Sequence, residues 1–396
     1  ILFHRLFCEE SEMYKSIVDE VPDYKSFYTV DELNESSEKL AKAYPRKVKI
    51  FEIGRSRKGE KIKALKIGKG KKIALLFGFP HPNEPIGSMT LEYFSWKLLE
   101  HEELLSQLDY IWYIIKCIDP DGARLNEGWF KGPFTPLNYA LNYYRPPGYQ
   151  QIEWTFPIKY KTLVFDKPIP ETRALMKIIE DAKPQFMYSL HNSGFGGVYF
   201  YVSSPCKPLY KKLQGLAKTE KLPLHLGEPE VPYMKKLADA IFLMFSSKET
   251  YDYLKKHAKK DPAEIINYGT SSDDYAKRVA KSFTLVCEMP YYYDSRINNV
   301  SESDIVRRNA VLQSIELSEQ IYEFVKENYA KAKSHIKDLE NKKPFMGSIE
   351  NYLRRFPDEI AADKHWAKTD KSLARKATVA EKFDSYVIMR FYGLLM

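Results

Sequence analysis

The chain has 396 residues, of which 44% are apolar or aromatic, enough to build one large domain or two medium ones around a substantial core. Its net charge of +8 is uneven, because residues 331–396, with 14 Lys/Arg and 9 Asp/Glu, supply +5 and the remainder only +3. The chain therefore lacks the dense basic stripe of a nucleic-acid binder, and no run of about 18 apolar residues spans a membrane.

The four cysteines, Cys8, Cys117, Cys206 and Cys287, show no paired spacing and are interpreted as buried free thiols. Free thiols favour a reducing, cytoplasmic compartment. Because the sequence opens at Ile1 rather than Met, a secreted protein whose leader has been removed is the alternative.

Helical and strand-like patterns alternate along the first half of the chain. In order, we predict a helix over 30–44, strands over 47–54, 61–68 and 71–79, a helix over 87–105, a strand over 110–118, a helix over 170–182, and strands over 185–191 and 282–290. This alternation predicts an α/β fold with a mixed, mostly parallel sheet flanked by helices. Ligands of such sheets bind at the carboxyl ends of the strands.

Two further segments stand outside this alternation. The stretch from Asp119 to Asp166 is irregular and rich in Pro, Gly, Tyr and Asn, which is typical of functional loops. After a helix around 303–329, the Lys-rich residues 331–396 have the pattern of an appended helical segment. We therefore divide the chain into an N-terminal segment (1–24), a main domain (25–330) and a basic helical extension (331–396), which we expect to pack on the main domain or on a second subunit.

The stretch "ALLFGFPHPNEP" ends a buried strand on a histidine between prolines. A residue that precedes proline avoids helical backbone, so His81 and Glu84 should share one small loop, with Pro85 as the first residue of a helix. The spacing alone is weak, because His225 and Glu228 repeat it. However, a second strand, "FMYSLH", also ends on a histidine, His191.

Two histidines and one glutamate form an established ligand set for catalytic zinc, so His81, Glu84 and His191 are candidate ligands for one zinc ion per chain. The same residues also fit a hydrogen-bonded core histidine and a carboxylate at the positive end of a helix. From the residues alone, both interpretations stay open.

The order of five motifs resembles the zinc carboxypeptidases of the carboxypeptidase A type, the M14 peptidases. These motifs are the opening "YTVDELNESSEKLAKAY…", then "HPNE", "PDG", "PETRALMKIIEDAKPQFMYSLH" and "TLVCE". The resemblance covers about residues 25–330. It implies that His81, Glu84 and His191 bind zinc, that Glu288 is the catalytic glutamate, and that Arg124 stabilises the oxyanion of the tetrahedral intermediate.

The sequence departs from this family where an Asn-Arg pair normally holds the substrate's terminal carboxylate. Alignment on the shared Phe-Pro places Glu153 and Trp154 there, whereas alignment on "LNYYRPP" keeps Asn142 and offers Arg145. Glu153 would repel a carboxylate.

The segment before Glu288 resembles the family's substrate-pocket loop. Tyr268 is the candidate for its mobile tyrosine, and Asp273 for an aspartate that pairs with basic side chains. Together with Glu153, Asp273 suggests a cationic group on the substrate.

The resemblance implies a zinc-dependent hydrolase of a peptide or amide bond that removes a C-terminal residue. The alternatives are a zinc peptidase acting on peptidoglycan stems, a deacylase that needs no terminal carboxylate, and a catalytically silent binding protein on the same fold. The sequence does not predict the oligomeric state.

Overall fold

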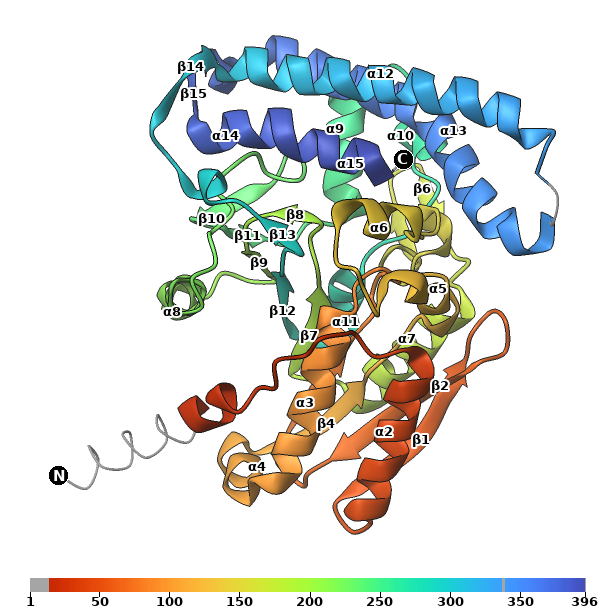
Figure 1. The fold of residues 1–396 in the computed structure, drawn as a ribbon, viewed down its shortest axis with the longest axis vertical. Coiled ribbons are helices and arrows are strands. Elements are labelled where there is room, and N and C mark those ends of the chain that lie inside the picture. Colours follow the sequence, from red (N-terminus) through yellow and green to blue (C-terminus); the bar gives the residue numbers. More distant parts are fainter. Residues whose placement is uncertain (1–13, 337–338, 396) are drawn as a thin grey trace.

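The computed structural model of the protein describes residues 14–336 and 339–395, and at its centre lies a nine-stranded sheet (Figure 1). The strands lie in the order β1-β2-β4-β3-β7-β12-β9-β11-β10. Neighbours among β4, β3, β7 and β12 pair in parallel, whereas β1, β2, β9 and β10 each add antiparallel pairs. The predicted mixed α/β sheet is thus confirmed. The bounds are β1 Val48–Arg55, β2 Lys61–Ile67, β3 Lys72–Phe77, β4 Tyr110–Ile115, β7 Phe186–His191, β9 Tyr199–Val202, β10 Lys235–Ala238, β11 Ile241–Leu243 and β12 Phe283–Glu288.

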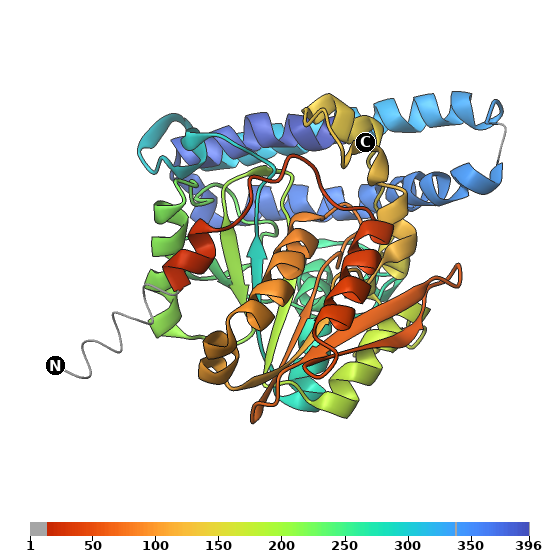
Figure 2. The same cartoon turned by 60° about the horizontal axis from the view of Figure 1, so that its bottom comes forward.

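Helices cover both faces of the sheet because successive side chains of its central strands point to opposite faces. On β3, Leu75 and Phe77 pack with α7 and α11, whereas Ala74 and Leu76 pack with α2, α3 and α4. Figure 2 shows α2 and α3 side by side across one face. The bounds are α2 Val30–Ala43, α3 Ile86–Glu100, α4 Glu102–Leu108, α7 Pro170–Ala182 and α11 Ser272–Ala280.

The helix predicted over 87–105 is in fact two helices, α3 and α4. The backbone of His101, with φ −112° and ψ 87°, is not helical; it ends α3, and α4 begins at Glu102. Two glutamates, Glu102 and Glu103, then occupy the first turn of α4, where the helix dipole favours negative charge. The amphipathic pattern continues across this break, which is why periodicity alone does not reveal it.

A C-terminal layer of helices lies across the upper end of the molecule in Figure 1. It comprises α12 (Arg307–Lys333), α13 (Leu339–Thr369), α14 (Val379–Phe383) and α15 (Met389–Leu395). α13 packs against α9 (Ser247–His257) and α15 against α6 (Pro136–Leu141), so the extension contacts the main domain. The proposed boundary between residues 330 and 331 falls inside α12, and the division into domains stays a prediction.

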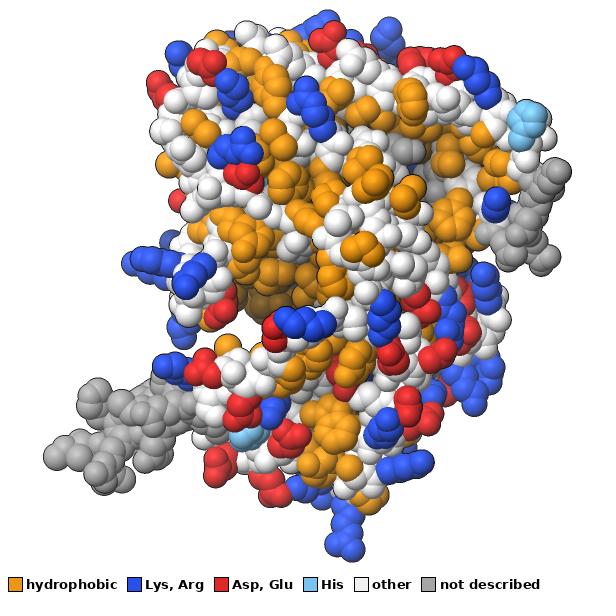
Figure 3. All heavy atoms as spheres, viewed as in Figure 1, with side chains coloured by type: hydrophobic (Ala, Val, Ile, Leu, Met, Phe, Trp, Pro, Cys, Tyr) orange, Lys and Arg blue, Asp and Glu red, His pale blue; other side chains and the backbone are white. Residues whose placement is uncertain are grey.

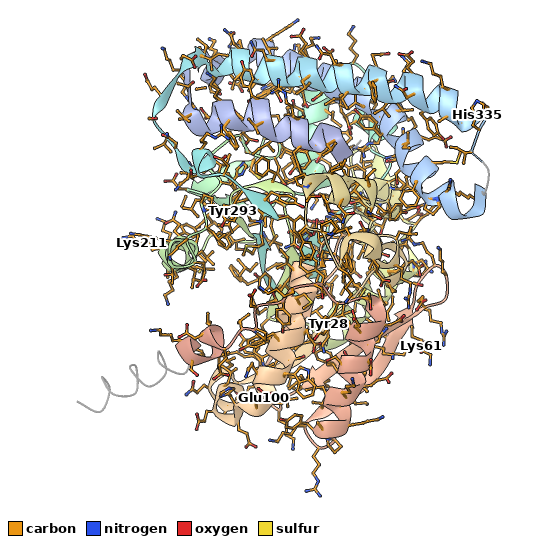
Figure 4. The ribbon with its side chains drawn as sticks, in the orientation of Figure 1. Tyr28, Lys61, Glu100, Lys211, Tyr293 and His335 are labelled. Atoms are coloured by element: carbon orange, nitrogen blue, oxygen red, sulfur yellow. The ribbon has the colours of Figure 1, made fainter. Side chains whose placement is uncertain are left out.

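On the face drawn in Figure 3, hydrophobic side chains gather in the middle, around a hollow, whereas Lys, Arg, Asp and Glu side chains are frequent towards both ends. Lys61 and Lys211 extend into solvent at the edges in Figure 4, as does His335 beyond the end of α12. No helix in the described ranges is long and apolar enough to cross a membrane. Cys117, Cys206 and Cys287 are free thiols as predicted, but only Cys287 is buried and the other two are half-buried; Cys8 lies outside the described residues.

Candidate metal centre and active-site cavity

The carboxyl ends of three parallel strands meet at one edge of the sheet. β3 ends at Phe77 and leads into the loop that carries His81 and Glu84, while β7 ends on His191. In the pairing of β12 with β7, Glu288 lies directly opposite His191. Register therefore places Glu288 beside the two strand ends from which the candidate ligands come.

The loop after β3 is a tight turn, in which the Glu84 amide donates to the His81 carbonyl over 3.1 Å. Pro85 is the N-cap of α3 and not its first residue as predicted, because the helix begins at Ile86. The Ile86 amide donates to the Asn192 side chain over 3.0 Å. This bond ties the loop to the residue that follows His191.

The three candidate ligands form a compact group. One ligand atom from each of His81, Glu84 and His191 lies within 4.8 Å of the other two, and all three residues are buried. His191 Nδ1 is 3.0 Å from Glu84 Oε2, and the two imidazole rings are 5.0 Å apart. In the described part of the chain, this is the only group of three or more His, Cys, Asp or Glu side chains with metal-binding geometry.

Their hydrogen bonds show that this group fits a cation. His81 Nδ1 is buried without a hydrogen-bond partner, and Glu84 Oε2 faces only Nδ1 of His191, another candidate ligand atom. Burying a polar atom without a partner is unfavourable unless an ion binds it. His191 Nε2 is already bonded to Ser189 Oγ at 2.9 Å, which leaves Nδ1 as its ligand atom. Two nitrogens and one carboxylate oxygen are a donor set that suits a divalent transition metal.

The electrostatics of the group agree with this assignment. Burial lowers the pKa of His81 well below its ordinary value, and neighbouring Arg145 adds to the effect, so the ring is neutral. Burial also lowers the pKa of His191, but Glu84, Glu153 and Glu288 together outweigh it and leave the pKa well above the usual range. A metal ion would take the place of the proton that these carboxylates attract.

Glu288 is buried at the edge of the same group, with Oε1 3.9 Å from His191 Nδ1. Burial raises its pKa well above that of an ordinary glutamate, and His191 opposes this effect. Glu288 also lines a cavity of about 670 Å³, which we call the main cavity and which the three candidate ligands line as well.

Arg145 reaches the cavity from the irregular segment. Its Nη1 is 3.2 Å from Glu84 Oε1, and about a third of its side chain is exposed. Its backbone carbonyl accepts a hydrogen bond from Ser348 in α13, so the C-terminal layer helps to fix the loop.

The structure does not bring Arg124 or Asn142 to this cavity. Arg124 lies in α5 (Pro120–Arg124) and forms ion pairs with Asp31 at 2.7 Å and Glu60 at 3.1 Å. Asn142, the C-cap of α6, donates to the Asn138 carbonyl. The local sequence does not determine the direction of these two side chains. Arg124 points away from the cavity because the carboxylates of Asp31 and Glu60 bind its guanidinium.

Glu153 lies behind His191. Its carboxylate accepts hydrogen bonds from Ser189 Oγ at 2.7 Å, Ser272 Oγ at 3.0 Å and the Ser272 amide at 3.0 Å, and it is 3.6 Å from His191 Nε2. In this position Glu153 can orient a metal-binding histidine, and Ser189 can do the same. The sequence predicted this role for neither residue. The spacing of Ser189 could have revealed its role. It precedes His191 by two residues on a strand, so both side chains lie on the same face of the sheet.

The remaining predicted residues lie at two places. Asp273 lines the main cavity. Tyr268 lines an adjoining cavity of about 640 Å³, where the guanidinium of Arg355 from α13 stacks on its ring at 4.8 Å. Arg145 lines both cavities, and so connects them.

The second histidine and glutamate with the same spacing have other partners. His225 Nε2 is 3.0 Å from Asp384 in the C-terminal layer, and Glu228 pairs with Arg307 at 2.6 Å. These two ion pairs join the main domain to the C-terminal layer, and we call them the latch.

Comparison with known proteins defines the class to which this fold and site belong. The family model of zinc carboxypeptidases matches residues 33–305, and the chain belongs to this family, the M14 peptidases.

Individual relatives match shorter stretches. A 107-residue stretch is 32% identical to carboxypeptidase B of Astacus astacus, covering 25% of this chain and 35% of that protein. Zinc carboxypeptidase A 1 of Anopheles gambiae is 29% identical over 128 residues, or 28% of this chain and 29% of that protein. The matched stretch thus spans about a third of the length of these relatives. Among solved structures, carboxypeptidase A from Helicoverpa armigera aligns at a TM-score of 0.44 and 16% identity, over 74% of this chain and 73% of that one.

Proposed function

We propose that this protein is a zinc-dependent hydrolase of amide bonds that removes the C-terminal residue of a peptide. The observation that carries the proposal is the strand register that sets Glu288 opposite His191, beside three buried residues whose donor atoms fit one cation. Family membership supports the reaction class, and the donor set supports zinc as the metal.

His81, Glu84 and His191 would hold the ion, and Ser189 and Glu153 would fix the ring of His191. Zinc, when bound, lowers the pKa of a coordinated water and polarises a carbonyl. Glu288 accepts the proton of the attacking water on its carboxylate and passes it to the nitrogen of the leaving amine. In the main cavity Arg145 is the cation best placed to take the substrate's carboxylate, since Glu228 holds Arg307.

The proposal is tested by measuring zinc content and the hydrolysis of a blocked dipeptide. We expect one zinc per chain, loss of activity on chelation, and recovery when zinc is added back. The free acid should be cleaved at least about a hundredfold faster than the C-terminal amide, because only the acid pairs with a guanidinium. Equal cleavage of both would instead favour the deacylase. The deacylase is the second candidate because Glu84 already contacts Arg145 and can neutralise the charge that a substrate carboxylate would need.

We further propose that Asp273 selects a basic side chain. It lines the main cavity, burial raises its pKa to about 7, and no cation among the described residues forms an ion pair with it. The carboxyl is therefore largely neutral at pH 6 and ionised at pH 8. We expect the ratio of kcat/KM for C-terminal Lys over Leu to rise about tenfold between these pH values. Asp273→Asn should abolish this rise, and a ratio independent of pH in the wild type would contradict the role.

A further inference from the structure

The main cavity extends from the candidate metal centre to the underside of the C-terminal layer. Apolar side chains from α12, α13, the segment before α15 and the start of α15 line this upper part, and we call it the roof chamber: Val311, Ile315, Ile360, Trp366, Ile388 and Met389. Protein interiors are packed closely and hold few voids larger than a water molecule. A cavity of about 670 Å³ with an apolar end is instead the size of a ligand site.

The roof chamber is built by this chain's own C-terminal layer. All six of its residues lie beyond residue 305, where the match to the family ends. Phe391 fixes the layer against the loop that follows His191: a Cβ atom at Gly194 would lie only 2.6 Å from Cε1 of its ring. The ring of Phe391 also stacks on Tyr139, with centroids 6.2 Å apart. The roof is therefore packed directly on the loop that carries a candidate ligand.

The charged groups at the edge of the roof chamber are already paired within the protein. Arg307 is bonded to Glu228, and Asp384 to His225, through the latch. Asp363 accepts a hydrogen bond from Tyr253 at 2.7 Å. No charged group of this edge is therefore left for a ligand. The remaining polar side chains from α12, α13 and the segment before α15 are the hydroxyls of Ser314, Ser318 and Ser385, so the surface left for an occupant is mainly apolar.

We propose that the roof chamber binds a bulky apolar group of the amide substrate, the size of an aromatic side chain or a medium-length acyl chain. The occupant is the substrate itself because the chamber and the candidate metal centre belong to one cavity. In this respect the inference rests on the proposed function. Burial of such a group would add affinity that a small amide does not gain.

Binding of two probes to the full-length chain tests the inference without hydrolysis. N-octanoylglycine and N-acetylglycine differ by six methylenes, and their affinities are measured by titration calorimetry in the Glu288→Gln variant, which prevents turnover. We expect the octanoyl probe to bind at least about a hundredfold more tightly, because the chamber removes its six additional methylenes from water. A difference below about threefold overturns the inference.

Two variants locate the binding, and a third serves as a matched control. Ile388→Asp places a charge in the roof chamber and should reduce the preference for the octanoyl probe at least about tenfold. Ile315→Trp fills the chamber instead and should do the same, which keeps the test decisive if the first variant folds poorly. Leu394→Asp changes an exposed residue of α15 that does not line the cavity and should leave the preference unchanged.

These measurements separate the two proposals. A protein that distinguishes the probes but hydrolyses no amide would contradict the proposed function and leave the apolar site in place. A protein that hydrolyses dipeptides without distinguishing the probes would overturn the roof chamber alone. If Leu394→Asp weakens octanoyl binding as much as Ile388→Asp does, the probe binds elsewhere and the inference fails.

Discussion

Replacing Glu288 by glutamine is expected to lower kcat by about 10²- to 10⁴-fold while zinc stays bound, because the amide cannot accept a proton from water. Glu288 is 3.9 Å from His191 Nδ1 and outside the group of three ligands, so its loss removes no ligand. Glutamine has the same shape, which limits the cost in stability. The measurements are kcat on a dipeptide with a free C-terminus, and zinc content by elemental analysis.

Glu302→Gln is the matched control for this prediction. Glu302 is an exposed residue of β14 (Glu302–Val306), so the same chemical change there should leave kcat within about twofold of the wild type. Retention of more than a tenth of the activity by Glu288→Gln would show that another group handles the proton. Loss of zinc together with activity would place Glu288 among the ligands.

The core of the candidate site could be predicted because it depends on strand ends. A buried apolar run that stops at His81 or His191 indicates the carboxyl edge of a sheet, and parallel strands bring such edges together. Glu288 was predicted from the family resemblance alone, and the structure shows that it too ends a parallel strand at this edge. Register then fixes these side chains to within a few ångströms, as the pairing of Glu288 with His191 shows.

The rest of the site depends on contacts that no local pattern encodes. Arg124 is a flexible side chain whose direction is set by Asp31 and Glu60, both distant in the sequence. The roof chamber arises where residues beyond 305 pack on the loop after His191. Such packing is non-local, and the amphipathic pattern of these helices predicted only that they would pack on some surface.

A histidine followed three residues later by a glutamate occurs twice in the sequence, and only the structural context shows which pair can bind a metal ion. His81 and Glu84 sit in a tight turn after a buried strand. His81 Nδ1 has no hydrogen-bond partner, and Glu84 Oε2 faces only His191, the third candidate ligand. His225 and Glu228 have the same spacing, but Asp384 and Arg307 satisfy both side chains. Only the first pair therefore has atoms left for a metal ion.

Replacement of Arg145 by glutamine should separate a carboxypeptidase from an amidase. Only Nη1 of its guanidinium contacts Glu84, and about a third of the side chain is exposed, so donors remain for a substrate carboxylate. A desolvated, charge-assisted pair of this kind is worth about 2 to 5 kcal/mol, so kcat/KM for the free-acid dipeptide should fall about 30- to 5,000-fold. The amidated dipeptide should lose less than about fivefold.

Arg355→Gln is the informative comparison, because Arg355 lines the adjoining cavity together with Arg145, whereas Glu228 holds Arg307 in the main cavity. Arg355 stacks on Tyr268 in the adjoining cavity and pairs with Glu359. If Arg145 holds the carboxylate, Arg355→Gln should leave the preference for the free acid within about threefold. The reverse result would move the carboxylate site into the adjoining cavity, where the C-terminal layer supplies the arginine that the family's usual position lacks. Equal, small effects of both variants on acid and amide would mean that no terminal carboxylate is recognised, and the deacylase would become the leading function.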